Sequence, residues 1–204
     1  MSAWRHNVRR PPNRGIEMTM NAREAILEAA RQAAQSHGYG GLNFRDLAEA
    51  VGVKSASVHY HFPTKADLGA AVARRYREDT AQGLDALLAE KSGPAEALHD
   101  YPGIFRKSLE NENRLCMCSF MSAEYDDLPA AVKTEVQGFA DVNVAWLEKA
   151  LLAAGAGQAE AARARAHAIF AAVAGAQLMA RSRSDISLFD DLLAAYRASG
   201  LLPA

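Results

Sequence analysis

The segment from Phe44 to Phe62, FRDLAEAVGVKSASVHYHF, constrains the fold more than any other part of the chain. Its first half places apolar residues at the spacing of one helical face, namely Phe44, Leu47, Ala48 and Val51. Ala48 is small enough to let a second helix cross closely, and Gly52 supplies a backbone that can turn tightly. Val58 and Phe62 then anchor a second short helix on the first. The pattern predicts a helix-turn-helix.

The second helix of this unit leaves its polar residues facing outward, and small side chains come first. Ser55, Ala56 and Ser57 lie at its N-terminus, where a recognition helix reaches base edges in the major groove. Hydroxyl, imidazole and basic groups that can meet bases or phosphates surround them: Arg45, Lys54, His59, Tyr60, His61 and Lys65. The alternative is an ordinary helical hairpin with a solvated polar face.

Charge is distributed unevenly along the chain. The formal net charge is −1, yet residues 1–65 contain nine Lys and Arg against five Asp and Glu. A basic first third on an otherwise acidic protein suggests that one end of the molecule faces a polyanion. Chance scatter of surface charge is the alternative, and charge alone does not separate the two.

The composition favours an all-α protein of two parts. Ala, Leu and Glu are frequent, β-branched runs are few, and no apolar run approaches the roughly 18 residues of a membrane span. Two cysteines make no disulfide scaffold, and without a secretory signal we expect a cytoplasmic protein. We expect a flexible basic extension over residues 1–20, a helix-turn-helix domain over 21–66, and an effector-binding and dimerisation bundle over 67–204.

Helix start and stop signals divide the chain further. Asn21 is a candidate N-cap, with Glu24 completing a capping box and Gly38 ending that helix. Short helices follow over Phe44–Val51 and Ser55–Phe62, and Pro63-Thr64-Lys65 opens a long helix toward Leu88. Beyond residue 90 we expect longer helices over about 94–110, 115–125, 129–153, 158–181 and 185–199.

Residues Ala22–Leu68 resemble the DNA-binding domain of the TetR/AcrR transcriptional regulators. The most specific part is His59-Tyr60-His61-Phe62 followed by Thr64-Lys65 and Leu68. The resemblance implies a dimeric repressor that binds a pseudo-palindromic operator and is released by a small-molecule effector. It assigns the DNA-facing positions to Arg45, Lys54, Ser55, Ala56, Ser57, His59, Tyr60, His61 and Lys65. Ala56 replaces the family's usual glycine or proline, so base preference cannot be inferred.

The segment Leu115–Leu128 resembles one branch of these regulators, in which a cysteine leads a helix. In some members that cysteine senses electrophiles or oxidants, and its counterpart here is Cys116. A thiol at a helix N-terminus has its thiolate favoured by the helix dipole, and Arg114 adjoins it. The alternative is a small buried hydrophobe. The expected effector and redox residues are Cys116, Cys118, Phe120, Tyr125 and Trp146.

Other assignments for these residues remain open. Cys116 and Cys118 with His99 or His167 could hold a metal ion, although the spacing is no standard zinc pattern and we expect no metal or cofactor. Motifs of hydrolases, nucleotide-binding loops and zinc proteases are missing, so we expect no enzyme, and a thiol enzyme ranks last. The aromatic residues of the second part are either a ligand pocket or plain core: Tyr101, Phe105, Phe120, Tyr125, Phe139 and Trp146.

The last two predicted helices carry small and apolar faces that could pair across a two-fold axis. On the first helix the face comprises Ala162, Ala166, Ile169, Val173 and Ala176, and on the second Leu188, Leu192, Leu193 and Tyr196. Close approach through alanines would build a four-helix bundle between two subunits. The alternative is that both faces pack inside one subunit.

Overall fold

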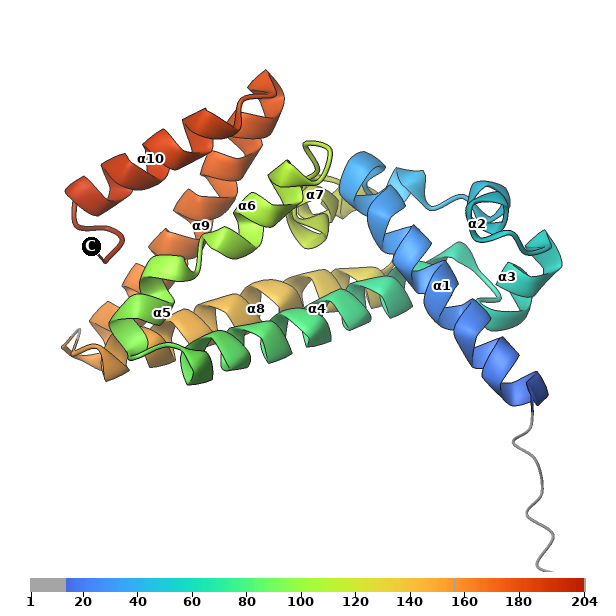
Figure 1. The fold of residues 1–204 in the computed structure, drawn as a ribbon, viewed down its shortest axis with the longest axis horizontal. Coiled ribbons are helices and arrows are strands. Elements are labelled where there is room, and N and C mark those ends of the chain that lie inside the picture. The colour runs from blue at the N-terminus through green and yellow to red at the C-terminus, as the bar shows by residue number, and fades with distance from the viewer. Residues whose placement is uncertain (1–13, 156, 204) are drawn as a thin grey trace, which may run out of the picture.

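A computed structural model describes residues 14–155 and 157–203, and this part of the chain is helical without strands (Figure 1). The helices follow one another as α1 Arg14–His37, α2 Phe44–Val51, α3 Ser55–His61, α4 Lys65–Glu90, α5 Pro94–Asp100, α6 Gly103–Glu110, α7 Met117–Ala123, α8 Ala130–Ala153, α9 Ala159–Arg183 and α10 Ile186–Ala198. Two 3₁₀ turns, η1 Tyr39–Gly41 and η2 Tyr125–Asp127, interrupt the series. The all-α prediction is confirmed.

The N-terminal unit, α1 to α3, forms where local signals agree. The Asn43 side chain accepts hydrogen bonds from the backbone N–H groups of Arg45 and Asp46, which fixes the start of α2. Gly52 ends α2 in the left-handed region at φ 75°, where a side chain would be strained. Thr64 and Asp67 form a capping box that starts α4. The predicted helix-turn-helix is therefore present.

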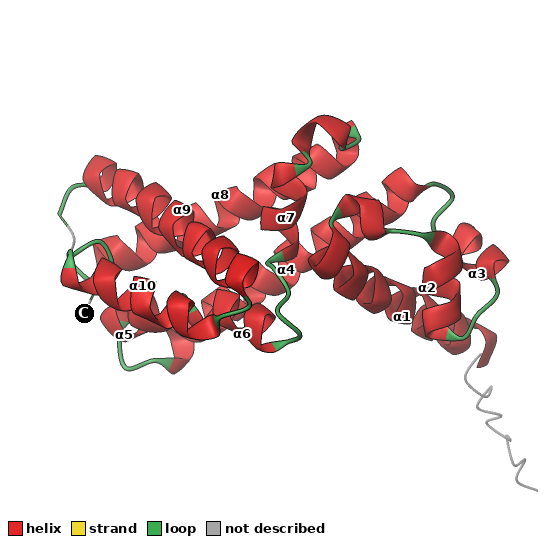
Figure 2. Ribbon diagram, turned by 90° about the horizontal axis from the view of Figure 1, so that it is seen from above, coloured by secondary structure: helices red, strands yellow, loops and turns green. Residues whose placement is uncertain are grey.

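Helix α4 leaves this unit and runs alongside α8 through the second part of the molecule (Figures 1 and 2). Helix α5 packs on α8, whereas α6 and α10 pack on α9. The sequence left open whether the aromatic residues of the second part line a ligand pocket or belong to the core. Four of them are buried in the core: Tyr101, Phe105, Phe139 and Trp146. The Tyr101 ring stacks on Trp146 at 5.6 Å, and its hydroxyl donates to Asn143 at 3.0 Å.

Two predicted boundaries were wrong. Helix α1 begins at Arg14, so Asn21 lies inside the helix and is not its N-cap; the rest of the predicted extension, residues 1–13, lies outside the described residues. The single helix predicted over 94–110 is two helices, because the chain bends at Tyr101-Pro102. A proline cannot donate the hydrogen bond that would continue α5.

Helix α9 carries small residues on two opposite sides. The face predicted to form the dimer lies inside one subunit, where Ala162, Ala166, Ile169, Val173 and Ala176 are at most 1% exposed. For α9 that prediction was wrong, because these residues pack against the subunit's own core. On α10, Leu193 is buried, and Leu188, Leu192 and Tyr196 are half-buried. The opposite side of α9 is exposed and follows the same helical spacing through Ala164, Ala168, Ala171, Gly175 and Leu178. We call this second face the exposed stripe.

Within the described ranges, none of the helices has the length and apolar character needed to span a membrane.

Candidate nucleic-acid interface and effector region

Helix α3 presents an almost wholly polar surface to solvent. Of its seven residues only Val58 is buried, and it anchors the helix to the core of the N-terminal unit. Lys54, Ser55, Ala56 and His59 are exposed, and Tyr60 is 77% exposed. We call these five residues the recognition face. Ser57 and His61 are half-buried at its margin.

The aromatic residues of α3 are held by neighbouring rings. His59 packs on Phe44 of α2 with ring centroids 4.6 Å apart, and Tyr60 meets His61 edge-on at 5.2 Å. The helix contains no acidic residue, and Arg45 lies exposed on α2 beside it. The arrangement can therefore approach phosphates without repulsion from its own helix.

Lys65 differs from the other predicted DNA-facing residues because it already has partners. Its ammonium donates to the carbonyl of Gly40 at 3.3 Å and lies 4.7 Å from the centre of the Tyr39 ring. The Tyr39 ring in turn fills the space beside Gly69 on α4, where an added Cβ would lie 2.7 Å from it. Lys65 thus braces turn η1 against the start of α4.

On its other side, η1 is held by the end of α7. The Glu124 carboxylate accepts hydrogen bonds from the backbone N–H of Tyr39 at 2.6 Å and of Gly40 at 3.4 Å. Gly38, at φ 65°, leaves room for this carboxylate, since an added Cβ would lie 2.2 Å from Glu124 Oε2. A carboxylate that joins backbone donors of another unit is a strong, geometrically specific contact.

The end of α1 just before η1 has further contacts with the second part of the molecule. The Arg181 guanidinium donates to the Ser36 carbonyl at 3.0 Å and lies 4.8 Å from the centre of the Phe120 ring. The N–H of Leu115 donates to the Gln35 carbonyl at 3.2 Å. With Glu124, these contacts join α7 and α9 to the base of the N-terminal unit, and we call the set the junction.

The two thiols lie in the core. Cys116 is the N-cap residue of α7 and is 2% exposed, and its N–H donates to the Gln177 side chain at 3.0 Å. Burial raises the pKa of the Cys116 thiol, although contacts with Ser119 and Tyr76 favour the thiolate. Burial raises the pKa of the Cys118 thiol well above its usual range.

Of the two alternatives for Cys116, its burial agrees with the small buried hydrophobe and not with a thiol of lowered pKa. Loss of hydration outweighs the helix terminus, and Arg114 pairs with Glu112. No cluster of three or more His, Cys, Asp or Glu side chains among the described residues could hold a metal ion.

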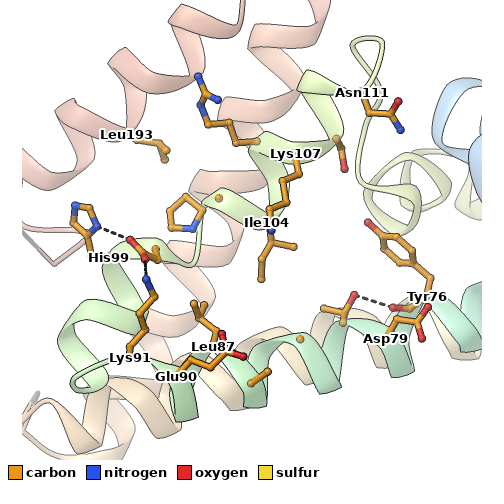
Figure 3. A pocket seen from close by; sticks show the side chains of 18 of the residues that line it. Tyr76, Asp79, Leu87, Glu90, Lys91, His99, Ile104, Lys107, Asn111 and Leu193 are labelled. Atoms are coloured by element: carbon orange, nitrogen blue, oxygen red, sulfur yellow. Dashed lines mark hydrogen bonds and ion pairs between the residues drawn. The ribbon is translucent and has the colours of Figure 1, made fainter.

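A cavity of about 900 Å³ lies between α4 on one side and α5, α6 and α10 on the other (Figure 3). None of the expected effector residues lines it: Cys116, Cys118, Phe120, Tyr125 or Trp146. Trp146 is buried in the core, and Tyr125 is exposed under the Lys133 ammonium. The cavity also reaches Arg31 and Gln35 near the end of α1.

Sequence reasoning missed the residues that join the two parts. Glu124 and Arg181 carry no local signature, because each acts on backbone atoms 85 and 145 residues away in the chain. Thr64 and Asp67 do have the spacing of a capping box, so that pair could have been found.

Comparison with known proteins agrees with this geometry. The family described as "Bacterial regulatory proteins, tetR family" matches residues 26–72. The HTH-type transcriptional repressor AcnR of Corynebacterium glutamicum is 42% identical over 62 residues, which cover 30% of this chain and 31% of that protein. The AcnR of Corynebacterium diphtheriae is 38% identical over 84 residues, or 41% of each chain. The chain thus matches less than half the length of these curated relatives.

Solved structures extend the likeness to the whole fold. A TetR-family regulator from Agrobacterium tumefaciens superposes with a TM-score of 0.81 at 28% identity, over 91% of this chain and 100% of that one. A TetR regulator from Legionella pneumophila gives 0.80 at 27% identity, over 86% and 95%. The chain thus matches the tetR family over residues 26–72, and its whole fold is similar to that of solved TetR-family regulators.

Proposed function

We propose that this protein is a DNA-binding transcriptional repressor whose α3 enters the major groove. The observation that carries the proposal is the recognition face, which presents small residues at the start of the helix and basic and aromatic residues after it. The name of the AcnR relatives, a transcriptional repressor, supports the same function, and the tetR family match over residues 26–72 includes this helix-turn-helix.

Binding to the DNA upstream of the protein's own gene tests the proposal. A fluorescence anisotropy titration at low salt should show saturable binding, and added competitor DNA of unrelated sequence should not abolish it. Ser55→Ala should shift the preference among operator variants, because a residue at the helix start meets base edges. Absence of any DNA affinity at low salt would refute the proposal.

We further propose that two copies bind a pseudo-palindromic operator together. The exposed stripe of α9 offers the small residues that let helices approach closely; Leu178 at its end is 57% exposed, and Met179 beside it is 45% exposed. Leu178→Glu should convert a dimer into a monomer in analytical ultracentrifugation, whereas Leu152→Glu, which introduces the same charge at another exposed leucine, should not. A wild-type monomer at micromolar concentration would refute the dimer.

Release by a small-molecule effector is the remaining part of the proposal. The cavity supports it, because its wall includes Arg31 and Gln35 of α1 together with the body of α4. A molecule bound there touches α1 of the N-terminal unit and α4, which leaves that unit. It releases DNA only if it binds the released conformation more tightly than the DNA-bound one.

A further inference from the structure

We propose that the cavity binds an amphipathic organic anion, a carboxylate attached to an apolar body. The inference rests on the proposed effector role of the cavity and adds the chemical class of its ligand. Its volume, about 900 Å³, lies within the range of small-molecule sites. The argument comes from which of its charged groups are already paired.

Most charges that line the cavity are neutralised by a neighbour. Arg106 pairs with Asp190 at 2.8 Å, Lys91 pairs with Asp100, and Arg31 pairs with Glu28 at 2.6 Å. Asp79 pairs with Arg75 at 2.8 Å. These groups line the cavity without offering it a free charge.

Two cations in its lining have no carboxylate partner. Lys107 on α6 and Arg197 on α10 form no ion pair with any residue in 22–155 or 157–203. The Arg197 Nη2 donates to the His99 carbonyl at 3.1 Å, while its Nε is buried without an acceptor. A guanidinium with unused donors is suited to a carboxylate oxygen.

The carboxylates that line the cavity provide less unpaired charge than the cations do. Glu90 is the one lining carboxylate that lacks an ion pair within the described part of the chain, and it lies on α4 beside Lys91 (Figure 3). The free charge is therefore positive on the α6 and α10 wall, where two cations face one distant carboxylate. This asymmetry selects an anion over a cation.

Apolar groups supply the rest of the site. Leu87 from α4, Ile104 from α6 and Leu193 from α10 project toward the cavity, and Lys107 extends across it from α6 (Figure 3). We place the apolar chain of the ligand between α4 and α6 and its carboxylate on the wall of α6 and α10, which carries Lys107 and Arg197. Burial of that chain supplies affinity, and the two cations fix its direction.

Three ten-carbon probes that differ only in their head group test the inference: decanoate, decanol and decylamine. Calorimetry on DNA-free protein, below the concentration at which each probe self-associates, should show decanoate binding at least about tenfold more tightly than decanol. Decylamine should bind most weakly. Equal binding of decanoate and decanol, tighter binding of decylamine, or no binding of decanoate to folded protein would each overturn the proposal.

Substitutions of the two unpaired cations test where decanoate binds. Lys107→Met and Arg197→Met should each weaken decanoate binding about tenfold and leave decanol unchanged, since they remove a charge and retain apolar bulk. Lys149→Met on the exposed surface of α8 is the matched control and should change nothing. Decanoate affinity that is the same in all three variants would overturn the proposed site.

The experiments distinguish failure of the ligand proposal from failure of the repressor proposal. DNA affinity is measured without probe, and probe affinity without DNA. Protein that binds DNA but not decanoate refutes the ligand class and leaves the repressor proposal intact. Protein that binds decanoate in the cavity but never DNA supports the ligand class and refutes the repressor.

Discussion

Helices α3 and α7 are both seven residues long, and sequence reasoning gave each of them a functional task. Helix α3 buries only Val58, so its polar side chains are free to meet another molecule. Helix α7 buries Met117, Cys118 and Met121, and Cys116 at its start is buried as well. The difference teaches that a helix terminus can activate a side chain only where the charged form keeps its hydration.

Glu124, which follows α7, binds the turn before α2 and so connects the second part of the molecule to the N-terminal unit. Gly38→Ala is the change expected to disturb this connection most. The new Cβ would occupy the position of the carboxylate, and alanine at φ 65° is strained. We expect a loss of about 3 kcal/mol in the free energy of unfolding, measured by urea denaturation.

Glu124→Ala provides the control for that prediction. It removes the carboxylate that the new methyl group would strike, so the double variant should lose less stability than the sum of the two single variants. Strict additivity would mean that Gly38 is needed for its backbone angle alone. The contact between Glu124 and η1 would then contribute nothing to the cost.

The same contrast explains which parts of the molecule could be predicted from its sequence. The start and stop of α2 depend on Asn43 and Gly52, which act on atoms within a few residues, and both α2 and α3 were predicted nearly to the residue. Burial of Cys116 depends on α4 and α9, through Tyr76 and Gln177. No periodicity within α7 encodes those partners, and the cavity, built from five helices, was likewise invisible.

Thiol reactivity tests the buried character of α7. In the folded protein, alkylation of Cys116 and Cys118 by iodoacetamide should be about 100-fold slower than in urea, because reaction requires local opening and the thiol pKa is raised. Mass spectrometry of the peptides gives both rates. Rapid and selective labelling of Cys116 with loss of DNA binding would instead establish the thiol-switch alternative.

The ion pairs between Glu135 on α8 and two arginines on α4 test whether the packing of these two helices depends on charge. Glu135 on α8 is buried and accepts hydrogen bonds from Arg74 at 2.8 Å and Arg77 at 3.0 Å. Burial alone would raise the pKa of Glu135, but these two bonds lower it below its ordinary value of 4.5. Glu135→Gln should cost about 2 kcal/mol of unfolding free energy at pH 7.

The pH dependence of that cost has a defined direction. Because the folded pKa of Glu135 is lowered, its stabilisation is complete above pH 4.5 and is lost as the pH falls through the folded value. Urea denaturation of both proteins at stepwise lower pH should therefore show the gap between them closing below pH 4.5. A gap that is constant with pH would assign the effect to packing.

The smallest expected effect concerns the recognition face, where single contacts are exposed. Lys54 is exposed at the start of α3 and has no ion pair within the described part of the chain. Lys54→Ala should weaken DNA binding a few-fold for all sequences alike and reduce the slope of log affinity against log salt by about 1. Stability should not change, because nothing packs on an exposed side chain. Lys149→Ala, equally exposed on α8, should leave the slope intact. If both variants change the slope equally, each lysine acts through the net charge of the whole molecule. In that case α3 lies no closer to the DNA than α8 does.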